Sequence, residues 1–338
     1  METVEILKAV CGAPGVSGAE NGTTAVIEKI MREFTDDIRY DALGDLICTV
    51  NPGKEKSIVL TAHTDKIGLA VTGIDKKSGF LRIGRVGGAD IRTFGAARVK
   101  VYGKKTLDGV ITSTPPHLAG GMSANKADPV DKVTIDCGLS YEEIKEIVSI
   151  GDRAEIRLPF TELLNGKVTS PFIDNSAGCA AVIKAVEAIS GKDCPYTVYA
   201  VFATREEVGK QGAKTALFGL DATEAIVTDV SFAVTKDVSE EHGSPLGSGA
   251  MIAYSPILQK KMSDELKSLA EKNSIPYTVE VLGRSTGTDA DVAVITKEGM
   301  KTGLVSIPLK NMHTPAELVK ISDIDCVADV MAAYLMRE

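Results

Sequence analysis

Five polar residues follow directly on four apolar, β-branched runs of the chain. His63 and the pair Glu206–Glu207 follow two of these runs, and Asp229 and His313 follow two more. In an open parallel sheet, ligands bind outside the edge formed by the carboxyl ends of the strands. We therefore expect these imidazoles and carboxylates to lie close together.

Asp174 extends this set, because it begins a predicted helix over 174–190 and helix starts lie at the same edge of such a sheet. Each residue alone has a simpler explanation: Asp174 could be a helix N-cap, and Asp229 or His313 a solvated loop residue. Those explanations do not account for polar groups at matching ends of four separate strands. The pattern therefore favours a shared site.

Two imidazoles and three carboxylates form a mixed nitrogen and oxygen donor set, which suits zinc, cobalt or manganese. A catalytic zinc ion usually keeps three protein ligands, so five ligands suit two ions that share a bridging carboxylate. Two divalent cations, three carboxylates and a bridging hydroxide also sum to zero charge. One of the adjacent glutamates is then free to carry a proton from metal-activated water to a leaving amine.

Asp65 follows His63 by two positions, a spacing that places both side chains on one face of an extended segment. A metal-binding histidine usually donates its second ring N–H to a carboxylate or a carbonyl. We expect Asp65 to orient His63 in this way.

The chain that must position these residues changes character twice. Residues 1–68 and 164–338 alternate apolar strand-like runs with helical periods, which predicts an α/β domain with a mostly parallel sheet flanked by helices. Residues 69–163 contain short runs rich in valine, isoleucine and glycine, with one helical period at 140–150. They predict an inserted small β-barrel or sandwich.

Composition excludes several classes of protein. The 338 residues carry a formal net charge of −8 and no basic run, which argues against a nucleic-acid partner. No apolar run reaches the length of a membrane span, and we expect neither a membrane partner nor a signal peptide. The six cysteines are scattered without a Cys-x-x-Cys pair, which indicates reduced thiols and a cytoplasmic location.

Several stretches of the chain resemble the M42 family of metallo-aminopeptidases, of glutamyl or tetrahedral aminopeptidase type, within the dinuclear zinc exopeptidases. The stretches run in the family's order from about residue 13 to 319: "APGVSGAE", "AHTDKIGL", "PPHL", "IDNSAGCAA", "TREEVGKQGA", "TDV", "TGTDAD" and "NMHTPAELV". The resemblance implies an enzyme that hydrolyses N-terminal residues from peptides with two zinc or cobalt ions. It also implies that residues 69–163 form a dimerisation domain of a homo-oligomer, commonly a tetrahedral dodecamer.

The resemblance makes Glu206 the general acid/base and Asp65 the residue that orients His63. It distributes the metal ligands as two pairs and one bridge: His63 with Asp229, Glu207 with His313, and Asp174 between the two ions. Two alternatives remain open, a deacylase or other amidase on the same site and an inactive metal-binding homologue. Glu206 argues against the second, because metal binding does not need it and proton transfer does.

Charges near the site bear on substrate choice. Thr288, Asp289 and Arg284 are candidates for the wall of the substrate pocket, although Thr288 and Asp289 could equally serve a tight glycine turn. Lys66 and Arg205 stand where the family usually has glutamate and glutamine. If two of these three basic side chains face the pocket, an acidic N-terminal residue is favoured.

The other departures from the family pattern, and the histidines outside the proposed site, say less about function. Alternation along a strand counts against Lys66 and Arg205 facing the pocket. Asn175 and Ser176 stand where the family usually has aspartate and arginine, and both lie beside proposed site residues. Of the remaining histidines, we expect His117 to be structural and His242 to be solvated.

Overall fold

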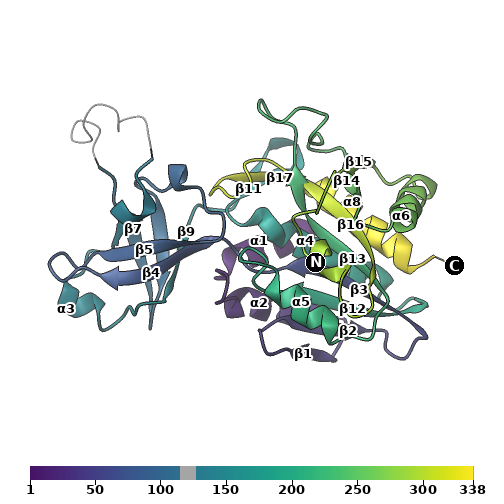
Figure 1. The fold of residues 1–338 in the computed structure, drawn as a ribbon, viewed down its shortest axis with the longest axis horizontal. Helices are drawn as coiled ribbons and strands as arrows, with labels where there is room; N and C mark the ends of the chain where they lie inside the picture. The colour runs from purple at the N-terminus through teal and green to yellow at the C-terminus, as the bar shows by residue number, and fades with distance from the viewer. Residues whose placement is uncertain (115–126, 338) are drawn as a thin grey trace.

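In the computed structural model, which describes residues 1–114 and 127–337, a β-barrel stands beside a larger α/β body (Figure 1). The body is built on an eight-stranded sheet. Its strands, in spatial order, are β1 (Ile38–Tyr40), β2 (Leu46–Val50), β12 (Tyr196–Ala203), β3 (Lys56–His63), β13 (Glu224–Phe232), β16 (Lys301–Leu309), β14 (Ala250–Tyr254) and β15 (Tyr277–Val281).

The centre of this sheet is parallel and its flanks are mixed. Strands β12, β3, β13 and β16 run parallel to one another, whereas β1–β2, β2–β12 and β16–β14 pair antiparallel. The predicted α/β class with a mostly parallel sheet is thus confirmed, with antiparallel strands added on both sides.

Side chains of the central strands alternate between two cores. On β3, Ile58 and Leu60 belong to one apolar cluster and Val59 to another, as the two-residue period of a strand requires. Because both faces are covered, apolar side chains predominate on both faces of the central strands.

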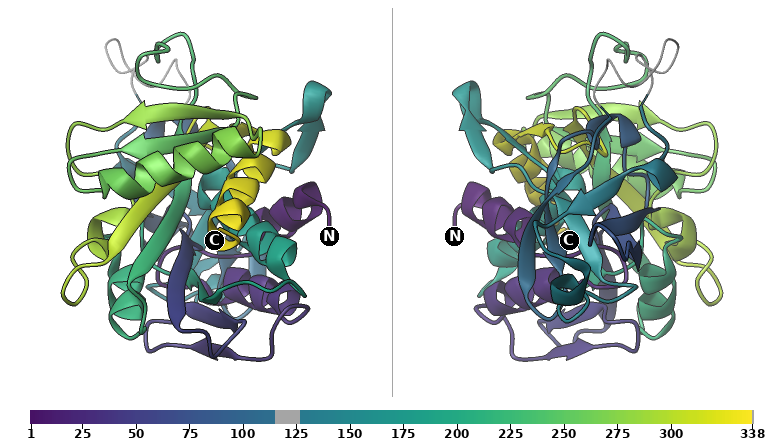
Figure 2. Two further views of the ribbon diagram at one scale, coloured as in Figure 1. Left: turned by 90° about the vertical axis from the view of Figure 1, so that its right-hand side faces the viewer. Right: turned by 90° about the vertical axis from the view of Figure 1, so that its left-hand side faces the viewer.

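Helices cover both faces of the sheet (Figure 2). The larger cluster contains side chains from α1 (Thr3–Gly12), α2 (Asn21–Met31), α4 (Ile173–Ile189), α6 (Lys260–Lys272) and α8 (Ile321–Leu335). The smaller cluster contains side chains from α5 (Gln211–Phe218) and α7 (Ala290–Ala293).

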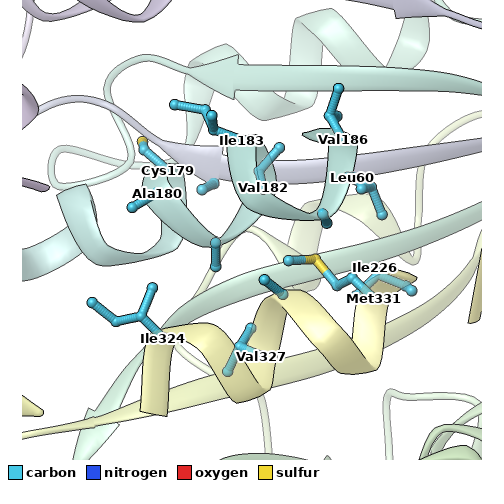
Figure 3. Close-up of a cluster of buried hydrophobic side chains, with 14 of the residues drawn as sticks. Leu60, Cys179, Ala180, Val182, Ile183, Val186, Ile226, Ile324, Val327 and Met331 are labelled. Atoms are coloured by element: carbon cyan, nitrogen blue, oxygen red, sulfur yellow. The ribbon is translucent and has the colours of Figure 1, made fainter. Parts of the chain in front are cut away.

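Helix α4 is the centre of the larger cluster and is apolar nearly all round. Figure 3 shows Ile183 and Val186 of α4 above Ile324 and Val327 of α8, with Leu60 of β3 close by. A helix enclosed on all sides is expected to lack a polar face. This packing fixes the start of α4, and with it Asp174, against the sheet.

The barrel is closed by six strands and has its own apolar core. In spatial order they are β4 (Gly68–Ile74), β5 (Leu81–Val86), β8 (Thr134–Asp136), β7 (Thr106–Ile111), β6 (Arg98–Tyr102) and β9 (Arg153–Ile156). The helical period at 140–150 forms a shorter helix than expected, α3 (Tyr141–Ile144). Ser140 and Glu143 form a capping box at its start, and Gly151, with a φ of 96°, lies in the turn that precedes β9.

A small sheet lies where the chain leaves the barrel. It consists of β10 (Thr161–Leu163), β11 (Lys167–Ser170) and β17 (Glu317–Lys320), so residues close to Asp174 in sequence pair with residues close to His313. Among the described residues, no helix has the length and apolarity needed to span a membrane.

Candidate dinuclear metal centre and active site

The parallel strands deliver the predicted ligands to one edge of the sheet. His63 is the last residue of β3, and Glu206 and Glu207 follow β12, whose last residue Ala203 is paired with His63. Asp229 lies on β13, beside β3. His313 follows β16, and Asp174 lies in the first turn of α4, so all five proposed ligands meet there.

The five residues form two donor sets that share Asp174. In the first set, His63 Nε2 lies 3.2 Å from Asp174 Oδ1 and 3.7 Å from Asp229 Oδ1. In the second set, His313 Nε2 lies 3.3 Å from Asp174 Oδ2 and 3.3 Å from Glu207 Oε1. Asp174 thus turns a different oxygen to each set, as a bridging carboxylate does.

These separations fit ligands arranged around common ions. Zinc bonds of about 2.0–2.1 Å in tetrahedral geometry place neighbouring ligand atoms about 3.3 Å apart, whereas direct N–H···O hydrogen bonds cluster near 2.9–3.0 Å. His63, Asp174 and Asp229 are also buried, and buried carboxylates this close together need a cation. The donor chemistry and the spacing therefore fit two divalent metals.

The pKa shifts of the proposed ligands show how unfavourable their buried negative charges are without a cation. Burial raises the pKa of Glu207 and of Asp229. Burial also acts to raise the pKa of Asp174, but hydrogen bonds with His313 and His63 outweigh it, so that this pKa lies below its ordinary value. Hydrogen bonds with Asp174 and Glu207 raise the pKa of His313 to about 11.

Glu206 lies beside both donor sets without belonging to either. Burial raises its pKa to about 9, and the charges of Asp229, Asp289 and Glu207 contribute in the same direction. Its closest cation is Lys210, whose Nζ lies 3.9 Å away. Glu206 lines the cavity, so its carboxylate can meet a substrate and a metal-activated water.

Asp65 positions both His63 and the pair Glu206–Glu207. Its carboxylate accepts hydrogen bonds from the backbone amides of Glu206 (2.8 Å) and Glu207 (3.1 Å), and from Ser17 Oγ (2.6 Å). His63 Nδ1 lies 3.1 Å from the Asp65 carbonyl oxygen and 3.4 Å from its carboxylate. The carbonyl therefore shares the orienting role that we expected of the carboxylate alone.

The left-handed backbone conformation of Arg205 allows Asp65 to accept hydrogen bonds from both glutamate amides. Its φ of 58° lies in the left-handed region, which turns the chain directly after β12 and aims two consecutive amides at Asp65. Two adjacent glutamates can then present their carboxylates to different partners.

Glu317 is a positioning residue that the sequence analysis missed. Its fully buried carboxylate accepts hydrogen bonds from the backbone amides of Asp174 (3.0 Å) and His313 (2.8 Å), so one side chain fixes two ligands that lie far apart in the sequence. Burial raises its pKa well above the ordinary value. An acidic residue at the start of the apolar run "ELV" was the available signal.

Of the three candidates for the wall of the substrate pocket, only Thr288 is among the residues that line the cavity. Thr288 lines the cavity, whereas Asp289 is buried and both its carboxylate oxygens lack a hydrogen-bond partner in the described part of the chain. Burial raises the pKa of Asp289 to about 7. Arg284 is exposed and is not among the residues that line the cavity.

The basic side chains expected near the pocket lie elsewhere. Lys66 is buried, and its Nζ donates to the carbonyls of Val10, Cys11 and Ala13 at the end of α1. Arg205 also does not line the cavity, whereas His242 is exposed at its wall. His117 lies outside the described residues. Lys66, Arg205 and Arg284 are not among the residues that line the cavity, so the condition set for an acidic preference is not met.

Comparisons with known proteins agree with this geometry. The family of M42 glutamyl aminopeptidases matches residues 44–330. A lysyl aminopeptidase of Pyrococcus furiosus is 32% identical over 337 residues, which cover 98% of this chain and 96% of that protein. The structure of an aminopeptidase from Desulfurococcus kamchatkensis superposes with a TM-score of 0.92 at 30% identity, covering 99% of this chain and 95% of the other.

A third relative is described by its assembly. The structure of the Pyrococcus horikoshii TET1 peptidase, reported to assemble into a tetrahedron or a large octahedral shell, superposes with a TM-score of 0.87 at 32% identity, covering 100% of both chains. The match to the family extends over most of the sequence and includes all five proposed ligands. The chain therefore belongs to the M42 family of aminopeptidases.

Proposed function

We propose that this protein removes N-terminal residues from peptides by dinuclear metal catalysis, with Glu206 as general acid/base. The observation that carries the proposal is the pair of donor sets sharing Asp174, with the Glu206 carboxylate beside both and bound to neither. Membership of the M42 family and relatives named aminopeptidases support the same activity.

Each residue has a distinct task in this proposal. His63 with Asp229, and Glu207 with His313, would hold two divalent ions, zinc or cobalt, with Asp174 shared between them. When bound, such ions polarise the scissile carbonyl and lower the pKa of a water molecule. Glu206 accepts the proton of the attacking water and returns it to the amine that leaves. Asp65 holds the amides of Glu206 and Glu207 so that the two carboxylates stay apart.

Assembly follows the same reasoning at a larger scale. The proposed division is a catalytic domain of residues 1–68 and 164–338 with a dimerisation domain of residues 69–163. The barrel has a core of its own and stands beside the body, which leaves its outer surface available to another copy (Figure 1). We propose a homo-oligomer, and a dodecamer is supported by the related structure of PhTET1-12s, which is described as a dodecamer. Six free cysteines support a cytoplasmic location.

A panel of aminoacyl fluorogenic amides tests the activity. Each amide is offered with a free or an acetylated N-terminus, to protein that has been chelated and then reloaded with zinc, cobalt or manganese. We expect cleavage of the free substrates after reloading and none after chelation. Cleavage of the acetylated substrates at a similar rate would indicate a deacylase or general amidase instead, and full activity of the chelated protein would contradict the metal centre.

A further inference from the structure

The cavity beside the donor sets carries more negative charge than the metal site requires. Its volume is about 990 Å³, and besides the carboxylates of the site it is lined by Glu240, Glu241 and Glu280. Among the described residues that line it, Lys210 is the sole lysine or arginine, and Lys210 Nζ lies 3.0 Å from Asp291 Oδ2. The cavity wall therefore offers no uncommitted cation to an acidic side chain.

Glu280 is the carboxylate that the fold holds in a fixed position. It lies half-buried on β15, whereas Glu240 and Glu241 are exposed. Ser231 Oγ donates to one carboxylate oxygen, and Ser306 Oγ donates to the other at 3.2 Å. An ionised carboxylate can accept about four hydrogen bonds, so these two hydroxyls orient it and leave room for a further donor. Burial raises the pKa of Glu280, so the hydroxyls do not fully offset its lost hydration.

The two serines tie Glu280 to the metal site. Ser231 follows Asp229 by two residues on β13, which places both side chains on the same strand face about 7 Å apart. Ser306 is the residue of β16 directly paired with Asp229. If the backbone of a substrate's N-terminal residue lies at the donor sets, a long side chain of that residue can reach Glu280. Met251 and Leu304 line the same cavity and add apolar surface.

We infer that Glu280 selects peptides whose N-terminal residue is lysine or arginine. The ammonium or guanidinium forms a charge-assisted hydrogen bond with the Glu280 carboxylate, while the methylene stem packs on the apolar wall. An acidic side chain would meet like charge, and a leucine side chain would cover a carboxylate that stays unpaired. The inference rests on the proposed aminopeptidase activity, and it is opposite to the acidic preference that would follow if two basic side chains faced the pocket.

The test compares kcat/KM for lysyl, arginyl, leucyl, glutamyl and Nε-acetyl-lysyl fluorogenic amides in wild type, Glu280→Gln and Glu240→Gln. Glutamine removes the charge and keeps one acceptor oxygen, and its NH2 group can donate to the hydroxyl oxygen of the other serine. Glu240→Gln removes the same charge from an exposed position of the cavity wall. We expect wild type to favour lysyl over leucyl and over Nε-acetyl-lysyl by at least about tenfold, as a single charge-assisted contact can do. Glu280→Gln should lower the lysyl and arginyl values by a similar factor, and it should leave the leucyl value unchanged or raise it, because the charge that a leucine side chain would cover is gone.

The outcomes distinguish a failure of this inference from a failure of the proposed aminopeptidase function. Wild type that cleaves leucyl or Nε-acetyl-lysyl amides as well as lysyl amides would overturn the inference while supporting the aminopeptidase. A lysyl preference that survives Glu280→Gln, or falls equally in Glu240→Gln, would overturn the role of Glu280. Cleavage of no aminoacyl amide with any metal would overturn both. The leucyl value reports whether the variant is folded, and the Nε-acetyl-lysyl comparison needs no variant.

Discussion

At the scale of single residues, Asp65 is the junction of the proposed site. Its carboxylate contacts the His63 ring and the backbone amides of Glu206 and Glu207. One side chain thus positions two proposed metal ligands, His63 and Glu207, together with the proposed acid/base, Glu206. Its ionised form only accepts hydrogen bonds, which suits three donors converging from the turn and Ser17.

Asp65→Asn should therefore lower activity more than its small change in shape suggests. The asparagine NH2 group would face a backbone N–H, so one donor of the turn loses its acceptor. We expect kcat/KM to fall about 10–100-fold, as is typical when a partner of a metal ligand is altered. Ser17→Ala, which removes a single donor, is the matched control and should cost less. Equal and near-normal kcat/KM in both variants would show that the turn does not depend on Asp65.

Strand-end logic predicted the ligands from the sequence, because the positions of His63 and Asp229 depend only on which runs are strands and which strands are parallel. It could not predict Glu317 or the contacts of Asp65 with two amides. Those depend on loop backbones, including positive φ values at Arg205 (58°) and His313 (62°), which no turn motif in the sequence marks. The folded loop, not a local pattern, places these groups.

At the scale of elements, Lys66 secures the end of helix α1. Its ammonium donates to Val10 O (2.8 Å), Cys11 O (3.2 Å) and Ala13 O (2.5 Å), where carbonyl groups lack intrahelical partners. Arg157, which follows the barrel strand β9, shares two of these carbonyls. A cation at a helix C-terminus is also favoured by the helix dipole. The departure of Lys66 from the family pattern thus has a structural explanation.

The pH dependence of stability should reveal this buried lysine. Burial lowers the pKa of Lys66 from 10.5 to about 8, so between these values the unfolded chain binds more protons than the folded chain. Raising the pH through this window must then stabilise wild type relative to Lys66→Met, by at most about 1.4 kcal/mol per pH unit. Urea unfolding of both proteins at pH 7 and pH 9.5 measures the change. A wild-type advantage that shrinks as pH rises would contradict the assignment.

The elements themselves were largely predictable, and the flanks of the sheet were not. Alternating helical and strand periods implied the parallel centre, because each crossover needs a helix. The antiparallel neighbours of this centre, β2 and β14, carry no such mark, since their residues are as apolar as those of β3. Only the register of the folded sheet shows that they run the other way.

At the scale of the whole molecule, the hairpin of β10 and β11 projects from the body (Figure 2). Leu164, at its tip, is 87% exposed, and Leu163 is 44% exposed. We propose that another copy covers these leucines in the oligomer.

Leu164→Glu should weaken this assembly. A charge cannot be buried there without a partner, so we expect a lower mass by light scattering at micromolar concentration, with the far-UV circular dichroism spectrum unchanged. Glu162→Gln, a polar exchange on the same hairpin, should keep the wild-type mass. A monomeric wild-type protein at physiological salt would contradict the proposed oligomer itself.

The measurement that tests the central claim most directly compares Glu206→Gln with Glu207→Gln in turnover and metal content. Neither variant changes the length of the side chain, and each removes one carboxylate from adjacent positions. We predict that Glu206→Gln keeps about two divalent ions per chain by elemental analysis and loses turnover about 10²–10⁴-fold, because an amide cannot carry the proton. Glu207→Gln should bind one ion more weakly as well. Near-normal turnover of Glu206→Gln, or loss of a metal from it, would contradict the account.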